Sequence, residues 1–396
     1  MRVISFCAAT SVVLLGLVVV GGGGSSAGAA SASPIKLLMS GAMSGTGQSD
    51  PEMESAVAAR VSVVNASGGV NGHRISVVYC DDQGDVNDAA TCAREAVSDH
   101  VVAVIDPYTQ YANAITAILA PAKIAFVGDE LISSADGTSP VAFPVDNVQL
   151  AQVAAAQQLV KDGCHKIGYL FLNVPPTEES YALVSKALDS SSTTVIPDEV
   201  DATTTDWSPA VESLFSKGAQ CLGGSIAYPQ SVQVLTAIQQ IKPGTKYSST
   251  QPPVGSDVKQ AFFDNTVFAQ SAVATNTTSD PDVKLFLKEM AKYAPKAPIT
   301  KQALAAWADV KLLVGALGSI KGSISNVSVL KAMGSISKPA TDVFGPDFKT
   351  THPLPIAGFQ RAFNTTIYLY HDVNGKYVPL GPPKNDEALL EKAVGK

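Results

Sequence analysis

The chain has 396 residues, a formal net charge of −7 at pH 7, 46% hydrophobic residues and 16% charged residues. This composition is typical of a packed globular protein and excludes an intrinsically disordered one, while the length predicts two domains. The acidic balance, without any run of Lys or Arg, argues against nucleic acid as a partner.

Residues 1–32 have the features of a secretory signal peptide. Arg2 precedes an apolar core from Val12 to Val20, and Ala30-Ser31-Ala32 forms an A-x-A cleavage site. The alternative is a membrane anchor, but the apolar run ends at four glycines, short of the roughly 20 residues that a span needs. We therefore expect cleavage near Ala32 and an exported protein, periplasmic or extracellular and associated with the cell envelope.

Strand and helix patterns alternate after residue 32, which predicts a parallel sheet covered by helices on both faces. The predicted strands at 101–105 and 124–127 are continuously apolar, as strands buried on both faces are. The first run comprises predicted strands at 35–40, 74–79, 101–105 and 124–127 and predicted helices at 51–65, 87–99 and 111–121.

Three motifs in this run point to a known family. The Ser/Gly-rich loop Gly41 to Gly47 follows the first strand, Asn65 to Gly72 (NASGGVNG) ends the first helix, and Asp81-Asp82-Gln83 follows the second strand. In the order and spacing of these motifs, the chain resembles the substrate-binding proteins of branched-chain amino acid type ABC transporters. Three later features also resemble this family: Gly128-Asp129-Glu130, Tyr181 and the Tyr368-Leu369-Tyr370 hairpin. The resemblance covers nearly the whole chain after residue 32. It implies an α/β protein with two doubly wound parallel-sheet lobes and a three-segment hinge, the type I periplasmic-binding fold.

A second run of the same pattern begins at Gln149. Two α/β halves in tandem predict either a nucleotide enzyme with two Rossmann-like domains or a binding protein hinged between lobes. The second run comprises predicted helices at 149–161, 178–189, 208–217 and 230–241 and predicted strands at 167–172, 194–196 and 220–226.

The last third of the chain divides between the two halves. Helices at 280–293 and 301–317 are expected to complete the first lobe, and Asn374-Gly375 predicts a hairpin. This arrangement needs crossings near residues 145, 272 and 342. The expected domains are then 33–145 plus 273–342 for lobe 1 and 146–272 plus 343–396 for lobe 2.

Four cysteines follow the predicted signal peptide, at 80, 92, 164 and 221, and an even number in an exported chain predicts two disulfides. Three pairings are possible. A local bridge between Cys80 and Cys92 is sterically reasonable. Cys164 and Cys221 each precede an apolar strand, and those strands are neighbours in the 2-1-3 order of a doubly wound sheet. The alternative is four buried thiols; no metal is expected, because neither C-x-x-C nor H-x-x-x-H occurs.

Ligands of open parallel sheets bind beyond the carboxyl ends of the strands. This rule selects three loops in the first lobe and the stretches 177–181, 227–228 and 249–251 in the second. Ser44 and Thr109 could hold a carboxylate or could only cap helices. Tyr108, Tyr181 and Tyr228 could close over a ligand or could pack in a core. The candidate ligand-binding residues are Ser44, Gly45, Tyr108, Thr109, Gln110, Asp129, Glu130, Tyr181, Tyr228 and Gln251.

This chain departs from the resembled family in the residues expected to hold the ligand. Its amino-acid-binding members hold the α-carboxylate with hydroxyl and backbone groups of lobe 1 and the α-amine with an acidic residue of lobe 2. Here acidic residues, Asp129 and Glu130, follow the fourth strand, and Gln251 lies where the acidic partner is expected. An acid facing the cleft would favour a hydroxyl or cationic group over a second carboxylate, whereas a solvated loop would have no such role.

Enzyme motifs are incomplete. Gly45-Thr46-Gly47 lacks the third glycine of G-x-G-x-x-G, and neither a P-loop nor G-x-S-x-G occurs. We expect no enzyme and no cofactor, but a monomer that captures a small organic ligand, amino-acid-like or another polar or aromatic compound. The resemblance implies delivery to the permease subunits of an ABC importer. The alternatives are a ligand-sensing receptor domain and, less favoured, a two-domain α/β enzyme.

Overall fold

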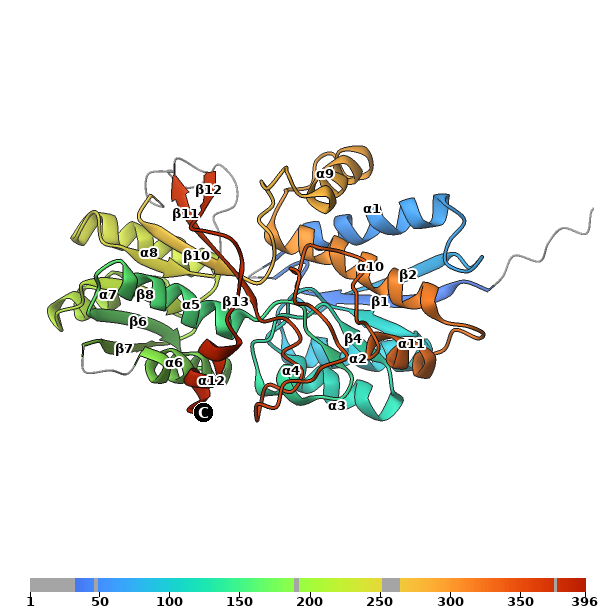
Figure 1. The fold of residues 1–396 in the computed structure, drawn as a ribbon, viewed down its shortest axis with the longest axis horizontal. Helices are drawn as coiled ribbons and strands as arrows, with labels where there is room; N and C mark the ends of the chain where they lie inside the picture. Colours follow the sequence, from blue (N-terminus) through green and yellow to red (C-terminus); the bar gives the residue numbers. More distant parts are fainter. Residues whose placement is uncertain (1–32, 46–48, 189–191, 251–263, 374–375) are drawn as a thin grey trace, which may run out of the picture. The chain divides into compact units, whose positions relative to one another are not determined.

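The computed structural model describes residues 33–45, 49–188, 192–250, 264–373 and 376–396. Two separate sheets organise this part of the chain, each in its own lobe (Figure 1). The sheet of the first lobe is wholly parallel and has the strand order β2-β1-β3-β4-β5. Its strands are β1 (Ile35–Gly41), β2 (Ile75–Asp81), β3 (Ala103–Ile105), β4 (Ala125–Val127) and β5 (Ala142–Phe143).

Helices cover both faces of the first sheet because successive strand residues point to opposite sides. Leu37 packs in a core with Phe286 and Trp307, whereas the next residue, Leu38, packs in another with Ile115. The first face carries α1 (Glu52–Ala66), α9 (Pro281–Tyr293), α10 (Lys301–Ser319) and α11 (Asn326–Met333), and the second carries α2 (Val86–Ser98) and α3 (Ala112–Ala122). Helices 280–293 and 301–317 thus complete this lobe as predicted.

The second sheet has the order β12-β11-β10-β9-β8-β6-β7, with β13 paired to β11. Strands β6 to β10 pair in parallel, and β11 runs antiparallel to β10, β12 and β13. The strands are β6 (Lys166–Leu172), β7 (Thr194–Val200), β8 (Cys221–Ser225), β9 (Tyr247–Ser249), β10 (Thr266–Gln270), β11 (Thr366–Val373), β12 (Lys376–Pro379) and β13 (Lys384–Asn385).

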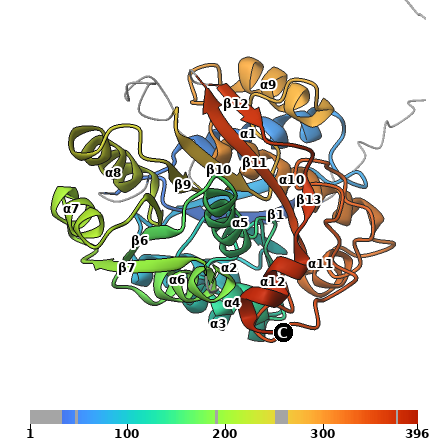
Figure 2. The same ribbon diagram turned by 60° about the vertical axis from the view of Figure 1, so that its left-hand side comes forward.

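Two helix layers again enclose this sheet. Helices α5 (Val148–Lys161), α6 (Pro175–Leu188) and α12 (Glu387–Val394) share one core with Tyr169 and Phe171. Helices α7 (Ser208–Ser216) and α8 (Tyr228–Ile241) share the opposite core with Leu170 and Trp207. Figure 2, in which this lobe comes forward, shows α6 and α12 side by side.

Both predicted disulfides are present. Cys80 and Cys92 join β2 to α2 with a Cα–Cα distance of 5.7 Å. Cys164 and Cys221 join the starts of β6 and β8 with a Cα–Cα distance of 6.1 Å. The second pairing follows from the strand order, since β6 lies between β7 and β8 as the 2-1-3 order requires.

The chain passes between the lobes through three segments: β5 to α5, β10 to α9, and α11 to β11. Asn364 in the third segment donates from Nδ2 to Val145 O at 2.7 Å and to Ser271 O at 2.8 Å, in the first and second segments. Ser271 N in turn donates to Asp146 Oδ1 at 3.1 Å. We name these contacts the hinge staple; it ties the three segments together.

The lobe boundaries at 145, 272 and 342 stay a prediction. The third segment does not enter the second lobe directly, because Phe344, Phe348 and Phe363 belong to the core of the first lobe, whereas Ile356 and Phe359 belong to the second. None of the described helices has both the length and the apolar composition that a membrane-spanning helix requires.

Candidate ligand-binding site

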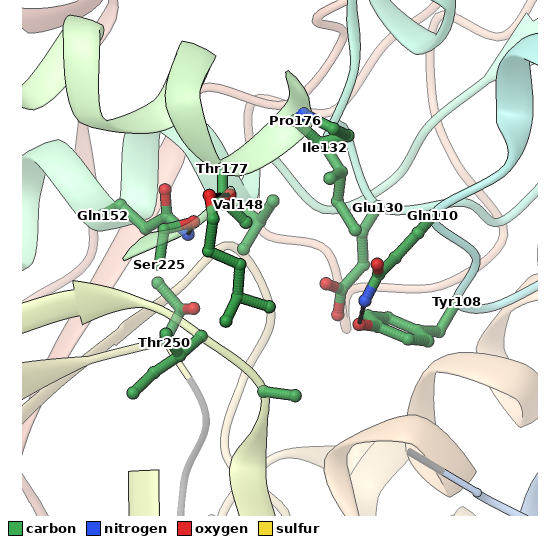
Figure 3. A pocket seen from close by; sticks show the side chains of 13 residues that line it. Tyr108, Gln110, Glu130, Ile132, Val148, Gln152, Pro176, Thr177, Ser225 and Thr250 are labelled. Carbon is green, nitrogen blue, oxygen red and sulfur yellow. Dashed lines mark hydrogen bonds between the residues drawn. The ribbon is translucent and has the colours of Figure 1, made fainter. Parts of the chain in front are cut away.

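A cavity lies where the carboxyl ends of strands from both sheets meet (Figure 3). The first turns of α5 and α6 also reach it, through Val148 and Gln152 of α5 and Pro176 and Thr177 of α6. Its volume is about 40 Å³. The lining comprises Tyr108, Gln110, Glu130 and Ile132 from the first lobe and Val148, Gln152, Leu172, Pro176, Thr177, Ser225, Ile226, Ala227 and Thr250 from the second.

Glu130 is the acidic group of this cavity and is 3% exposed. Its Oε1 lies 2.7 Å from Lys301 Nζ, which also lies 2.7 Å from Asp146 Oδ2. Burial raises the pKa of Glu130 to about 7, against the opposing effect of Lys301. Burial alone would lower the pKa of the Lys301 ammonium, but Asp146 and Glu130 together raise it above its usual value. Lys301 therefore stays charged and joins the cavity to the hinge staple.

Two side-chain pairs hold the polar groups on either side of the cavity. On the first-lobe side, Gln110 Nε2 donates to the Tyr108 hydroxyl at 3.1 Å. On the second-lobe side, Gln152 Nε2 donates to Ser225 Oγ at 2.9 Å. Figure 3 shows the Tyr108 phenol and the Glu130 carboxylate next to each other at the cavity. Both lobes thus present a rigid, hydrogen-bonded edge to any bound molecule.

Of the ten candidate residues, three line the cavity: Tyr108, Gln110 and Glu130. Gln251 lies outside the described residues. The rule of strand ends also selected the stretches that contain Thr177, Ala227 and Thr250, which line the second-lobe side. The rule could not reach Gln152, because that residue lies one turn into α5 rather than after a strand.

Ser44 and Gly45 do not line the cavity, because their loop folds onto the end of β2. Ser44 donates from its backbone N to Asp81 Oδ1 at 3.1 Å and from its hydroxyl to Asp81 Oδ2. Gly45 adopts φ +126°, and a Cβ there would lie 2.4 Å from the backbone oxygen of Gln83. The hydroxyl expected to bind a carboxylate or cap a helix is instead paired with Asp81.

Thr109, Tyr181 and Tyr228 have structural contacts of their own. Thr109 is buried, and its Oγ1 accepts from Tyr111 N at 3.1 Å in the turn before α3, although it does not cap that helix. Tyr181 stacks on Phe171 with ring centroids 4.6 Å apart. Tyr228 is the half-buried first residue of α8 and lies outside the cavity lining. That these three residues contact a ligand stays a prediction, and the observed arrangement does not favour it.

Asp129 also turns away from the cavity. It is completely buried in the first lobe with Asp106 and Asp136. Burial, followed by the charge of Asp136, raises its pKa well above the usual value. Asp129 is therefore an interior group of the first lobe rather than a solvated loop residue, and Glu130 alone of the acidic pair lines the cavity. Among the described residues, no group of three or more His, Cys, Asp or Glu side chains is placed to hold a metal ion.

Two lobes with mainly parallel sheets, joined by three segments and enclosing a cavity at the strand ends, define the class of two-lobe periplasmic binding proteins. The sequence agrees: residues 34–360 match the model of the family described as Periplasmic binding protein. The chain belongs to this family, which confirms the prediction of a binding protein rather than an enzyme. A search of curated proteins finds no match.

Solved structures share the fold at low sequence identity. A fatty acid ABC transporter substrate-binding protein from Thermomonospora curvata matches with a TM-score of 0.75 and 15% identity, covering 91% of this chain and 94% of that one. A solute-binding protein from R. palustris in complex with 4-hydroxybenzoate matches with a TM-score of 0.71 and 19% identity, covering 89% of this chain and 97% of that one. A branched-chain amino acid transporter substrate-binding protein from Streptococcus pneumoniae in complex with isoleucine matches with a TM-score of 0.69 and 16% identity, covering 88% of this chain and 100% of that one.

Proposed function

We propose that this protein is the exported solute-binding component of an ABC importer. It captures a small organic ligand between its lobes as a monomer and delivers that ligand to permease subunits. The observation that carries the proposal is the cavity built by both lobes beside the hinge staple. A ligand that touches both sides stabilises the closed arrangement by its difference in affinity for the closed and open states.

The size of the cavity supports hinge bending. Its volume of about 40 Å³ is far below the roughly 300 Å³ at which sites for small organic ligands begin. Entry of a molecule of amino-acid size therefore requires the Glu130 side and the Gln152 side to separate. The solved relatives bind a branched-chain amino acid or an aromatic acid, so the class of ligand has to be tested for this chain.

A thermal-shift screen tests the proposal. The chain from Ser33 onward is unfolded and refolded to remove any bound ligand, and is then melted with amino acids, amides, aromatic acids, sugars and polyols. A ligand that binds only the native state raises the melting temperature. We expect one chemical class to do so, with a decrease in the radius of gyration in solution scattering at the mass of one chain. Absence of any shift across the panel contradicts the proposal.

Export and delivery have their own measurements. N-terminal sequencing of the protein recovered outside the cytoplasm should begin near Ser33. Uptake of the identified ligand by cells that lack this protein should fall. Unchanged uptake would instead favour the sensing function.

A further inference from the structure

Glu130 has one carboxylate oxygen that the protein leaves unused. Lys301 occupies Oε1, but among the residues that the structure describes no group donates to Oε2, although this atom is buried. A buried acceptor without a donor costs roughly 1–3 kcal/mol, and more when it is charged. Because Glu130 lines the cavity, a hydrogen-bond donor on the ligand would remove this cost.

The charges around Glu130 favour a cationic donor. Glu130 is the one charged side chain among the described residues that line the cavity. Behind it, the single charge of Lys301 faces two carboxylates, Glu130 and Asp146, which leaves one negative charge in excess. Asp50 adds a further acidic influence on Glu130. A carboxylate ligand at this position would therefore be repelled, and a neutral one would leave the excess charge uncompensated.

Tyr108 completes the surroundings of a cation. Its phenol lies next to the Glu130 carboxylate at the cavity (Figure 3) and is held there by the hydrogen bond from Gln110. A phenol oxygen can accept a hydrogen bond as well as donate one. Glu130 Oε2 and the Tyr108 hydroxyl, both from the first lobe, thus offer one ammonium group two acceptors.

We propose that the ligand carries a protonated amine and that Glu130 Oε2 accepts a hydrogen bond from this ammonium group beside the Tyr108 hydroxyl. This inference rests on the proposed function, because it names the class of molecule that the cavity holds. Gln152 and Ser225, on the opposite lobe, take the remaining polar groups of the ligand.

The pH dependence of binding follows from the same geometry. The groups that face Glu130 are Lys301 of α10, Asp146 after β5, Asp50 before α1 and Tyr108 after β3. With a pKa of about 7, Glu130 is mostly protonated at pH 6 and mostly ionised at pH 8. An alkylammonium group stays protonated throughout, so its affinity should rise by about tenfold between these pH values, in proportion to the ionised fraction of Glu130.

The experiment uses three sets of matched probes that differ in one group: 3-methylbutylamine, 3-methylbutanol and 3-methylbutanoate; tyramine, tyrosol and 4-hydroxyphenylacetate; and ethanolamine, ethylene glycol and glycolate. The thermal shift of the protein is measured with each probe at pH 6 and pH 8. We expect at least one amine to exceed its alcohol and carboxylate partners at pH 8 and to lose most of its effect at pH 6.

Variants assign the effect to Glu130. Glu130→Gln keeps the size of the side chain and should weaken binding of that amine by at least tenfold and remove its pH dependence. Asp129→Asn changes the neighbouring buried carboxyl, which does not line the cavity, and should leave the amine shift unchanged. The pH profile of the unaltered protein provides a readout that does not depend on the folding of either variant.

Three results would overturn the inference: a carboxylate or alcohol that equals its matched amine, an amine shift that survives Glu130→Gln, or no shift from any amine. A shift from a carboxylate or alcohol would leave the solute-binding function intact. Failure of the proposed function is recognised separately, by the absence of any shift in the wider ligand panel.

Discussion

The side-chain amide of Asn364 donates a hydrogen bond to the backbone oxygen of Ser271 at 2.8 Å. The same amide reaches Val145 O at 2.7 Å, and its own oxygen accepts from Thr366 N at 3.0 Å. One buried side chain therefore joins all three segments between the lobes, which is the region that would bend in the proposed capture of a ligand.

Asn364→Ala should lower the free energy of unfolding by about 1–3 kcal/mol, because two buried carbonyl oxygens lose a donor. Urea denaturation of the variant measures this loss. Asn276→Ala, at an exposed position within the second segment, is the matched control and should change stability little. Equal stability of the two variants would show that the hinge staple contributes nothing to the folded state.

Lys301→Met should be strongly destabilising at pH 7.5, by about 3–5 kcal/mol, because it leaves the buried carboxylates of Glu130 and Asp146 without their cation. The loss should shrink at pH 5.5, where Glu130, with a pKa of about 7, takes up a proton. Urea denaturation at the two pH values measures both effects.

The exposed ion pair of Lys217 and Asp198 supplies the control. Its N–O distance is 3.5 Å and the Lys217 side chain is 47% exposed, so Lys217→Met should cost less than about 1 kcal/mol. A loss for Lys301→Met that is the same at both pH values would contradict the role assigned to Glu130.

Asp309 on α10 should make the protein less stable as the pH rises. Its carboxyl is completely buried, neither oxygen has a hydrogen-bond partner among the described residues, and burial raises its pKa well above the usual 3.8. The folded state therefore holds a proton that the unfolded state releases, and stability falls from about pH 4 up to the folded-state pKa.

Asp309→Asn removes this titration with a side chain of equal size. It should raise the free energy of unfolding at pH 7 and should have little effect below about pH 4. Glu199→Gln, an exposed change on β7, is the control. A pH–stability profile that is the same for Asp309→Asn and the unaltered protein would refute the assignment.

The two disulfides should differ in their contribution to stability. Cys164–Cys221 spans 57 residues and Cys80–Cys92 spans 12. In the chain-entropy model, the Cys164–Cys221 bridge stabilises the folded state by about 4 kcal/mol and the Cys80–Cys92 bridge by about 3 kcal/mol. Replacing each pair by serine and measuring thermal unfolding tests the order. Alkylation without reductant should leave all four cysteines unmodified in the intact mass, and four free thiols would rule out both bridges.

Much of the fold could be predicted because the alternation of apolar strands and helices is local. The helix predicted at 301–317 is observed at Lys301–Ser319, and the strand at 167–172 is observed at Lys166–Leu172. The two-residue strands β5 and β13 escaped prediction, because two residues are too few to show a period. The pairing of Cys164 with Cys221 followed from strand order alone.

The sequence predicts which loops surround the candidate site, but it does not predict which side chains of those loops face the cavity. The strand-end rule depends on topology, which the sequence pattern reveals. The direction of a side chain depends on tertiary partners, and these decided the outcome: Asp81 pairs with Ser44, Phe171 stacks on Tyr181, and the interior of the first lobe encloses Asp129. The adjacent Glu130 faces the cavity because α10 supplies Lys301 as its partner.

The two disulfides each connect elements of a single lobe, β2 with α2 in the first and the starts of β6 and β8 in the second. Neither of these covalent links bridges the cavity or restrains the three segments between the lobes. Reduction of the disulfides would thus change how firmly each lobe is folded without acting on the proposed opening and closing of the lobes. A molecule that is reduced but still folded should release its ligand at the same rate as the oxidised one.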